Sequence, residues 1–78
     1  MNNVISIRPA TSDDRSVLNR LAALDSAPVP AGPVLIAEVN GRPEAALGIE
    51  DHAVVADPFE PTAQLVDLLR VHALHLAA

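Results

Sequence analysis

The sequence predicts an α+β fold of order βαβββα, a four-stranded antiparallel sheet carrying two helices. Two segments, 17–24 and 65–76, repeat apolar residues at helical spacing, and short β-branched runs lie before and between them. An Asn-Gly pair at 40–41, flanked by apolar runs, is typical of a tight hairpin. The chain has 78 residues, which predicts a single domain over residues 1–78.

The first strand is expected over 4–8, because Val4-Ile5-Ser6-Ile7-Arg8 is β-branched and Pro9 ends the run. A helix should start directly afterwards. Thr11 as N-cap with Asp14 at the third helical position forms a capping box, in which each side chain binds a backbone N–H of the other. Asp13 and Asp14 also favour the positive end of the helix dipole, which explains them better than a cation site does.

The central part of the chain predicts a stiff loop followed by three strands. Residues 27–33 hold three prolines and one glycine, so they form the loop after a helix that ends near Asp25. Strands are expected over 34–39, 43–49 and 53–56, with a turn at 50–52 between the last two. In the second of these strands one face should hold Ala45, Leu47 and Ile49.

A final helix is expected after Thr62, which serves as its N-cap. The side chains predicted to point inward are Leu65, Val66, Leu68, Leu69, Ala73 and Leu76. The polar side is made of Gln64, Asp67, Arg70 and His75. Val71 and Leu74 flank that polar side, so the apolar arc is wider than one docking face requires.

The sheet should be apolar on both faces. Val4, Val34 and Ile36 lie opposite the main core face of the first two strands. Both faces must therefore be covered, either by one helix on each side or by a second subunit.

Composition excludes several classes of protein. The formal net charge is −5 with no Lys, and Phe59 is the one aromatic residue, so nucleic-acid binding is not expected. Cysteine is absent from the sequence, which excludes disulfides and thiolate metal sites. The chain shows neither a leader peptide nor an apolar run long enough for a membrane span, and a cytoplasmic location is expected. Arg used to the exclusion of Lys indicates a GC-rich, bacterial origin.

Two segments resemble the opening of the GNAT-type N-acetyltransferases. Residues 5–14 (ISIRPATSDD) are similar to the family's first strand and helix start, and 35–48 (LIAEVNGRPEAALG) to the hairpin that follows. The likeness covers about residues 4–57. It implies that the chain corresponds to the N-terminal half of such an enzyme, without the later strands and helices that complete the acceptor groove.

The sequence departs from the family where acetyl-coenzyme A would bind. The resemblance implies a pyrophosphate loop of the form Arg/Gln-x-x-Gly-x-Gly/Ala between the fourth strand and the next helix, whose glycines let backbone N–H groups converge on the anion. The corresponding stretch, 57–63, reads DPFEPTA and contains neither glycine nor a cation. Pro58 and Pro61 lack an N–H, while Asp57 and Glu60 would repel a diphosphate. No cofactor-binding or catalytic residue of the family is assigned to this chain.

The remaining polar residues are explained by structure rather than chemistry. His72 and His75 are three apart on the last helix and could share a metal with Asp67 or Glu60, but such pairs are common without metal and no metal site is predicted. His72 is expected to pack, His75 to meet the helix dipole, and His52 to be solvated in its turn. Arg8 and Arg42 should pair across the hairpin with Glu38, Glu44 or Glu50.

The sequence therefore predicts a non-catalytic GNAT-like module that associates with protein, most readily as a homodimer, since a chain this small buries little apolar surface alone. The alternative is an acetyltransferase-related enzyme whose acyl-coenzyme A cleft is completed by a second chain. A regulatory or antitoxin-like partner of another protein is a third possibility.

Overall fold

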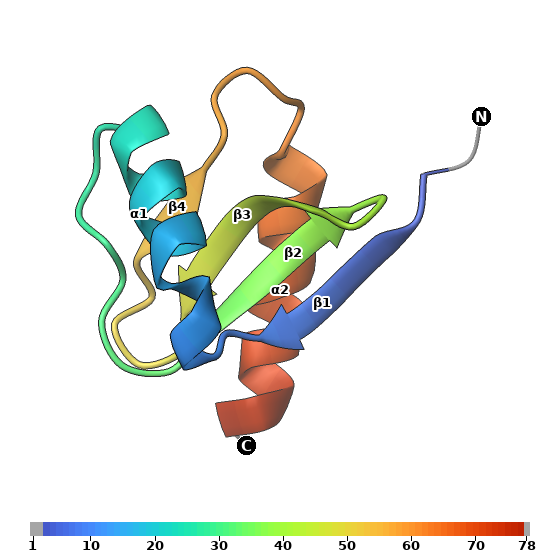
Figure 1. Cartoon of the computed structure of the whole chain (residues 1–78). Coiled ribbons are helices and arrows are strands. Elements are labelled where there is room, and N and C mark those ends of the chain that lie inside the picture. Colours follow the sequence, from blue (N-terminus) through green and yellow to red (C-terminus); the bar gives the residue numbers. More distant parts are fainter. Residues whose placement is uncertain (1–2, 78) are drawn as a thin grey trace.

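The computed structural model describes residues 3–77, in which four strands, two α-helices and one 3₁₀ turn follow the predicted order (Figure 1). The elements are β1 (Ile5–Pro9), η1 (Ser12–Asp14), α1 (Arg15–Leu24), β2 (Val34–Val39), β3 (Arg42–Gly48), β4 (Val54–Ala56) and α2 (Ala63–Ala77). The strands form one sheet in the order β1-β2-β3-β4, and every neighbouring pair is antiparallel. The predicted α+β fold and its meander are confirmed.

The β2–β3 hairpin is set by its turn. Asn40 and Gly41 have φ values of 54° and 82°, and this pair of left-handed conformations is what a type I′ turn requires. The turn brings Ala37 opposite Ala45 and Leu35 opposite Leu47, with a register shift between Ala37 and Glu38. The apolar residues of both strands therefore share faces.

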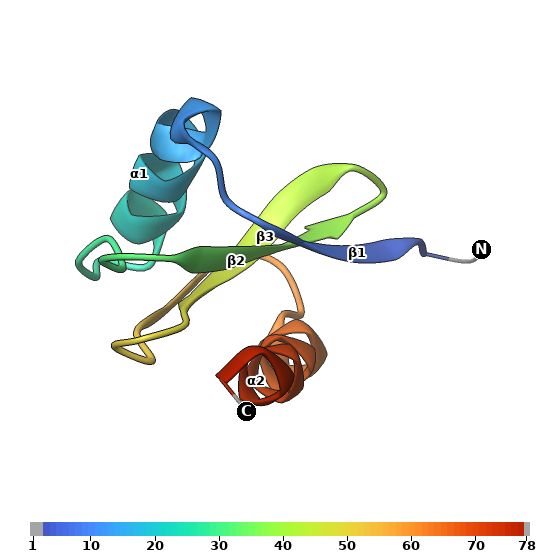
Figure 2. The same cartoon turned by 90° about the horizontal axis from the view of Figure 1, so that it is seen from below.

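Each face of the sheet is covered by one helix (Figure 2). On one face α2 buries Leu65, Leu69 and Ala73 against an apolar group from β2 and β3, made of Leu35, Ala37, Ala45 and Leu47. On the other face α1 buries Leu21 and Ala22 against Val34, Ile36, Ala46 and Val55. Of the two predicted ways of covering both faces, the structure uses one helix on each side.

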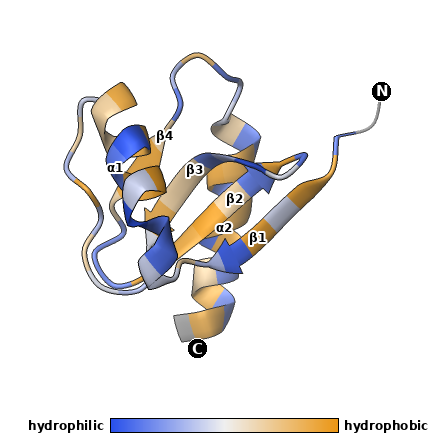
Figure 3. Ribbon diagram, in the orientation of Figure 1, coloured by the Kyte–Doolittle hydropathy of each residue, from blue (hydrophilic) through white to orange (hydrophobic). Residues whose placement is uncertain are grey.

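The helices do not cover the whole sheet. The main contacts of α2 are with β2 and β3, and those of α1 are with β3 and β4. Ile5 of the edge strand β1 stays 39% exposed. Apolar colour continues onto β1 (Figure 3), and α2 also leaves Leu68, Val71 and Leu74 exposed.

Two side chains predicted to point inward do not do so. Leu68 is 37% exposed and Leu76 is 57% exposed. Leu68 lies on the flank of the buried row formed by Leu65 and Leu69. Leu76 continues the buried direction but lies in the last turn, past the residues that contact the sheet. The apolar arc of α2 is wider than the sheet it covers.

The start of the first helix follows the predicted capping box. The Thr11 Oγ1 accepts a hydrogen bond from the Asp13 N–H at 3.3 Å, and the Asp14 Oδ2 accepts one from the Thr11 N–H at 2.7 Å. The first turn is 3₁₀ rather than α. The helix ends at Leu24 and is followed by Ser26 with φ 51°, as predicted to within two residues.

Strand bounds differ slightly from expectation. Pro9, predicted to end the first strand, belongs to β1 and pairs with Leu35. An edge strand tolerates proline where the missing N–H would face away from the sheet. The hydrogen bond from the Ala10 N–H to the Val34 carbonyl shows that the neighbouring residue, not Pro9, donates to β2.

Shortening one buried and one exposed leucine of α2 tests which face of this helix packs against the sheet. Leu69 is fully buried and Leu74 is 68% exposed on the same helix. Leu69→Ala should lower the free energy of unfolding by about 2–5 kcal/mol, because it leaves a cavity in the core. Leu74→Ala should change it by no more than about 0.5 kcal/mol. Urea denaturation at one chain concentration measures both, and equal losses would show that α2 is not docked by this face.

Candidate functional site

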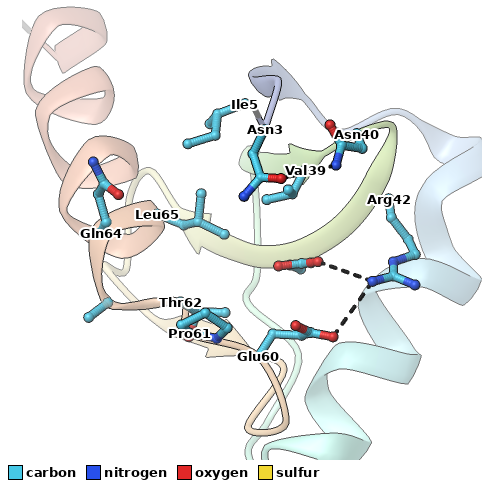
Figure 4. A pocket seen from close by; sticks show the side chains of 12 residues that line it. Asn3, Ile5, Val39, Asn40, Arg42, Glu60, Pro61, Thr62, Gln64 and Leu65 are labelled. Carbon is cyan, nitrogen blue, oxygen red and sulfur yellow. Dashed lines mark hydrogen bonds and ion pairs between the residues drawn. The ribbon is translucent and has the colours of Figure 1, made fainter. Parts of the chain in front are cut away.

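A solvent-open cavity lies between β1, the end of the β2–β3 hairpin and the first turn of α2 (Figure 4). It has a volume of about 800 Å³. Its apolar wall is formed by Ile5, Val39 and Leu65, and its polar residues include Asn3, Asn40, Arg42, Thr62 and Gln64. No residue of β4 lines it. The cavity therefore opens on the β1 side of α2.

The charged groups of the cavity are paired with one another. The Arg42 guanidinium lies 3.6 Å from a Glu44 carboxylate oxygen and 3.6 Å from one of Glu60 (Figure 4). The Glu44 side chain is only 8% exposed and lines the cavity. One cation and two carboxylates give these three side chains a formal charge of −1. This balance opposes an anionic ligand.

The link from β4 to α2 turns its backbone donors inward. The Phe59 N–H donates to the Asp57 Oδ1 at 2.9 Å, and the Glu60 N–H donates to the Asp57 carbonyl at 3.3 Å. Pro58 and Pro61 have no N–H to offer. Thr62 takes the predicted N-cap position, and its carbonyl accepts from the Val66 N–H at 3.0 Å. The donors left for a ligand are those of the first turn of α2.

The three histidines were considered as metal ligands or proton-transfer groups, and no metal site was predicted for them. His52, His72 and His75 are all exposed, so His72 does not pack as expected. Within residues 3–77 no three His, Asp, Glu or Cys side chains lie close enough together to hold a metal ion. His52 has φ 58°, a left-handed conformation that suits its place in the turn after β3.

The ionic cluster with the shortest contacts joins β1 to the start of α1 and to β2. Two nitrogens of the Arg8 guanidinium each donate to one Asp14 oxygen at 2.8 Å, and both Arg8–Glu38 contacts are 3.4 Å. The Arg8 hydrogen bonds and the Thr11 N–H hold the pKa of Asp14 well below its ordinary value. The hydrogen bond to Asp14, opposed by desolvation and helped by Glu38, raises the pKa of Arg8. These groups are fully engaged with one another, so the cluster is structural.

The sequence pointed to only part of these contacts. The pairing of Arg8 with Glu38 and of Arg42 with Glu44 was among the expected alternatives, whereas Glu50 lies instead over Gly32. The link between Arg8 and Asp14 was missed, because Asp14 was already explained as a capping residue. The Arg42–Glu60 contact was also missed, since it joins segments whose approach depends on how α2 docks.

A second candidate site is a surface for association, formed by Ile5, Leu68 and Val71, here named the β1–α2 surface. The exposed fractions of these side chains are 39%, 37% and 50%. Gln64 and Leu65 share the cavity with Ile5, which shows that this side of α2 faces β1. Leu68 lies four residues after Gln64 and three after Leu65, and Val71 lies about one turn after Leu68. Both therefore continue the same side of the helix. The three side chains of this surface are apolar and remain partly exposed to solvent.

Comparison of the chain with protein-family models, with characterised proteins and with solved structures finds no match. Among residues 3–77, no helix is both long enough and apolar enough to cross a lipid bilayer.

The Arg8–Asp14 pair should make the free energy of unfolding depend on pH in the acid range. Its depressed pKa in the folded state means that Asp14 stabilises the fold fully above its ordinary value of 3.8 and loses this contribution as the pH falls below it. Asp14→Asn should be less stable than wild type at pH 7, and the gap should close as the pH falls below about 3.8. Urea denaturation across this range measures the gap. Asp13→Asn, at the exposed neighbouring residue, is the control and should show little gap at any pH; a gap for Asp14→Asn that is constant with pH would contradict the assignment.

Proposed function

We propose that this chain is a non-catalytic, self-associating module related to the N-terminal half of GNAT-type N-acetyltransferases, lacking the acetyl-coenzyme A pyrophosphate loop. The observation that carries the proposal is the β1–α2 surface, an apolar row left open beside an edge strand. A homodimer covers such a row with the same row of a second copy. The proposal includes a cytoplasmic location and no bound cofactor.

The size of the core supports association. Among the described residues thirteen apolar side chains are buried. Five of the thirteen are alanines, which contribute little area each, namely Ala22, Ala37, Ala45, Ala46 and Ala73. A domain of this size buries roughly 60% of the surface its unfolded chain exposes, which leaves a small margin of stability. Burying Ile5, Leu68 and Val71 against a second chain adds to that margin.

The alternative is an enzyme whose acyl-coenzyme A cleft is completed by a second chain. The open cavity at the first turn of α2 favours it, because helix N-termini attract anions. Three features weigh against it. The cavity carries Glu44 and Glu60, the link before α2 turns its N–H groups toward Asp57, and the opening is not beside β4.

Mass as a function of concentration tests the proposed self-association. Sedimentation equilibrium from micromolar to millimolar chain concentration should approach twice the chain mass of 8.2 kDa. Leu68→Glu should weaken association by about tenfold or more, about 1.4 kcal/mol, because it places a charge in the apolar row. Leu74→Glu, on the outward side of the same helix, is the matched control. A mass of 8.2 kDa at every concentration would refute the proposal.

A thermal-shift titration separates the two functions. The proposed non-catalytic module should show no change in Tm with acetyl-coenzyme A, since the ligand stabilises only a protein that binds it. A rise in Tm that saturates would establish the enzyme alternative. In that case Glu60→Gln, which removes a carboxylate from the cavity rim, should increase the rise.

A further inference from the structure

The outer edge of β1 exposes a short, regular set of unpaired backbone groups. At the two ends of β1, the Val4 carbonyl accepts from the Asn40 N–H and the Ala10 N–H donates to the Val34 carbonyl. Because bonded residues alternate along an antiparallel strand, Ile5 and Ile7 direct their N–H and C=O groups away from the sheet. Pro9 continues this outward series without an N–H, and its carbonyl already accepts from Arg8 at 3.3 Å. Two residues, Ile5 and Ile7, therefore offer two donors and two acceptors.

The opposite edge of the sheet is protected. β4 has three residues, and the Ala56 N–H on its outer side donates to the Asp25 Oδ2 at 3.2 Å. β1 has no such side-chain acceptor on its outer N–H groups among the hydrogen bonds of the described residues. Its one charged side chain, Arg8, is tied to Asp14 and Glu38. Proteins normally shorten, charge or cover an edge strand to prevent pairing, and β1 shows this only at Pro9.

We propose that two copies of the chain pair through β1 about a two-fold axis, in antiparallel register with Ile5 opposite Ile7, to form one eight-stranded sheet. This inference rests on the proposed self-association and specifies how it occurs. In this register each Ile5–Ile7 pair exchanges two hydrogen bonds, so the seam contains four. Every outward N–H and C=O of Ile5 and Ile7 is then satisfied.

Neighbouring registers satisfy fewer groups within β1. If Ile7 lies opposite Ile7, Ile5 faces Pro9, which has no N–H and whose carbonyl is shared with Arg8. If Ile5 lies opposite Ile5, Ile7 faces Asn3, outside the strand. The Ile5–Ile7 register uses both donors and both acceptors of each strand and needs no residue beyond β1.

The side chains agree with this register on both faces. On the α1 side it places Ser6 opposite Ser6 and Val4 opposite Arg8 of the second copy. Val4, 64% exposed in the single chain, then covers the aliphatic stem of that arginine. No like charges face each other across the seam. On the α2 side the isoleucines of both strands lie together, and Leu68 of each copy borders them.

Cysteine cross-linking tests the register directly, because the natural chain contains no cysteine. In the proposed register Ser6 of the two copies forms a non-hydrogen-bonded pair with Cα atoms about 4.5 Å apart, within the range of a disulfide. Ser6→Cys should therefore give a disulfide-linked dimer in a glutathione redox buffer. Ser16→Cys, at an exposed position on α1, is the matched control and should stay largely monomeric on non-reducing gels.

Three outcomes distinguish the proposed register from self-association itself. At least tenfold more cross-linking for Ser6→Cys than for Ser16→Cys, with reduced Ser6→Cys keeping the wild-type sedimentation mass, supports the register. Equal cross-linking of the two variants, with a wild-type mass of twice 8.2 kDa, overturns the register and leaves self-association standing. A wild-type mass of 8.2 kDa at all concentrations overturns both.

Discussion

The structure depends on a β2–β3 hairpin that is apolar on both faces. Leu35 and Leu47 point to one side while Ile36 and Ala46 point to the other, and all four are at most 1% exposed. A sheet of this kind cannot fold with one side in water, so it requires a helix on each side. The sequence contains two helices, and both are used to cover the hairpin and β4. β1 is the strand with the least cover: its Ile7 packs against the α2 core group, whereas Ile5 stays 39% exposed at the open edge.

Ionic contacts hold the periphery of this core in place rather than forming a reactive site. Arg8 links β1 to Asp14 at the start of α1 and to Glu38 of β2, which fixes the edge strand and the helix entry together. Arg42 links the hairpin to the segment before α2 through Glu44 and Glu60. Each contact satisfies a charge within the fold. The charged side chains that line the cavity beside α2, Arg42, Glu44 and Glu60, are consequently already paired with one another.

Sequence reasoning identified the features with local causes. The capping box of Thr11 and Asp14, the left-handed Asn40–Gly41 turn and the alternation along β2 and β3 are each fixed by neighbours in the chain. It failed where the answer depends on how far a docked element extends. Leu68 and Leu76 match the inward helical spacing, but whether they are buried depends on the width and length of the sheet beneath α2. The Arg42–Glu60 contact and the cavity likewise depend on where α2 comes to rest, which no local pattern records.

The proposed self-association depends most directly on the open edge of β1. Amide hydrogen exchange of Ile5 and Ile7, followed by NMR as the chain concentration is raised, measures whether that edge is covered. The exchange of these two amides should slow as the concentration rises, while the Ser6 amide, already bonded within the sheet, should change much less. If Ile5 and Ile7 exchange at the rate of free amides at every concentration, the edge remains open to water and β1 is not where the chains meet.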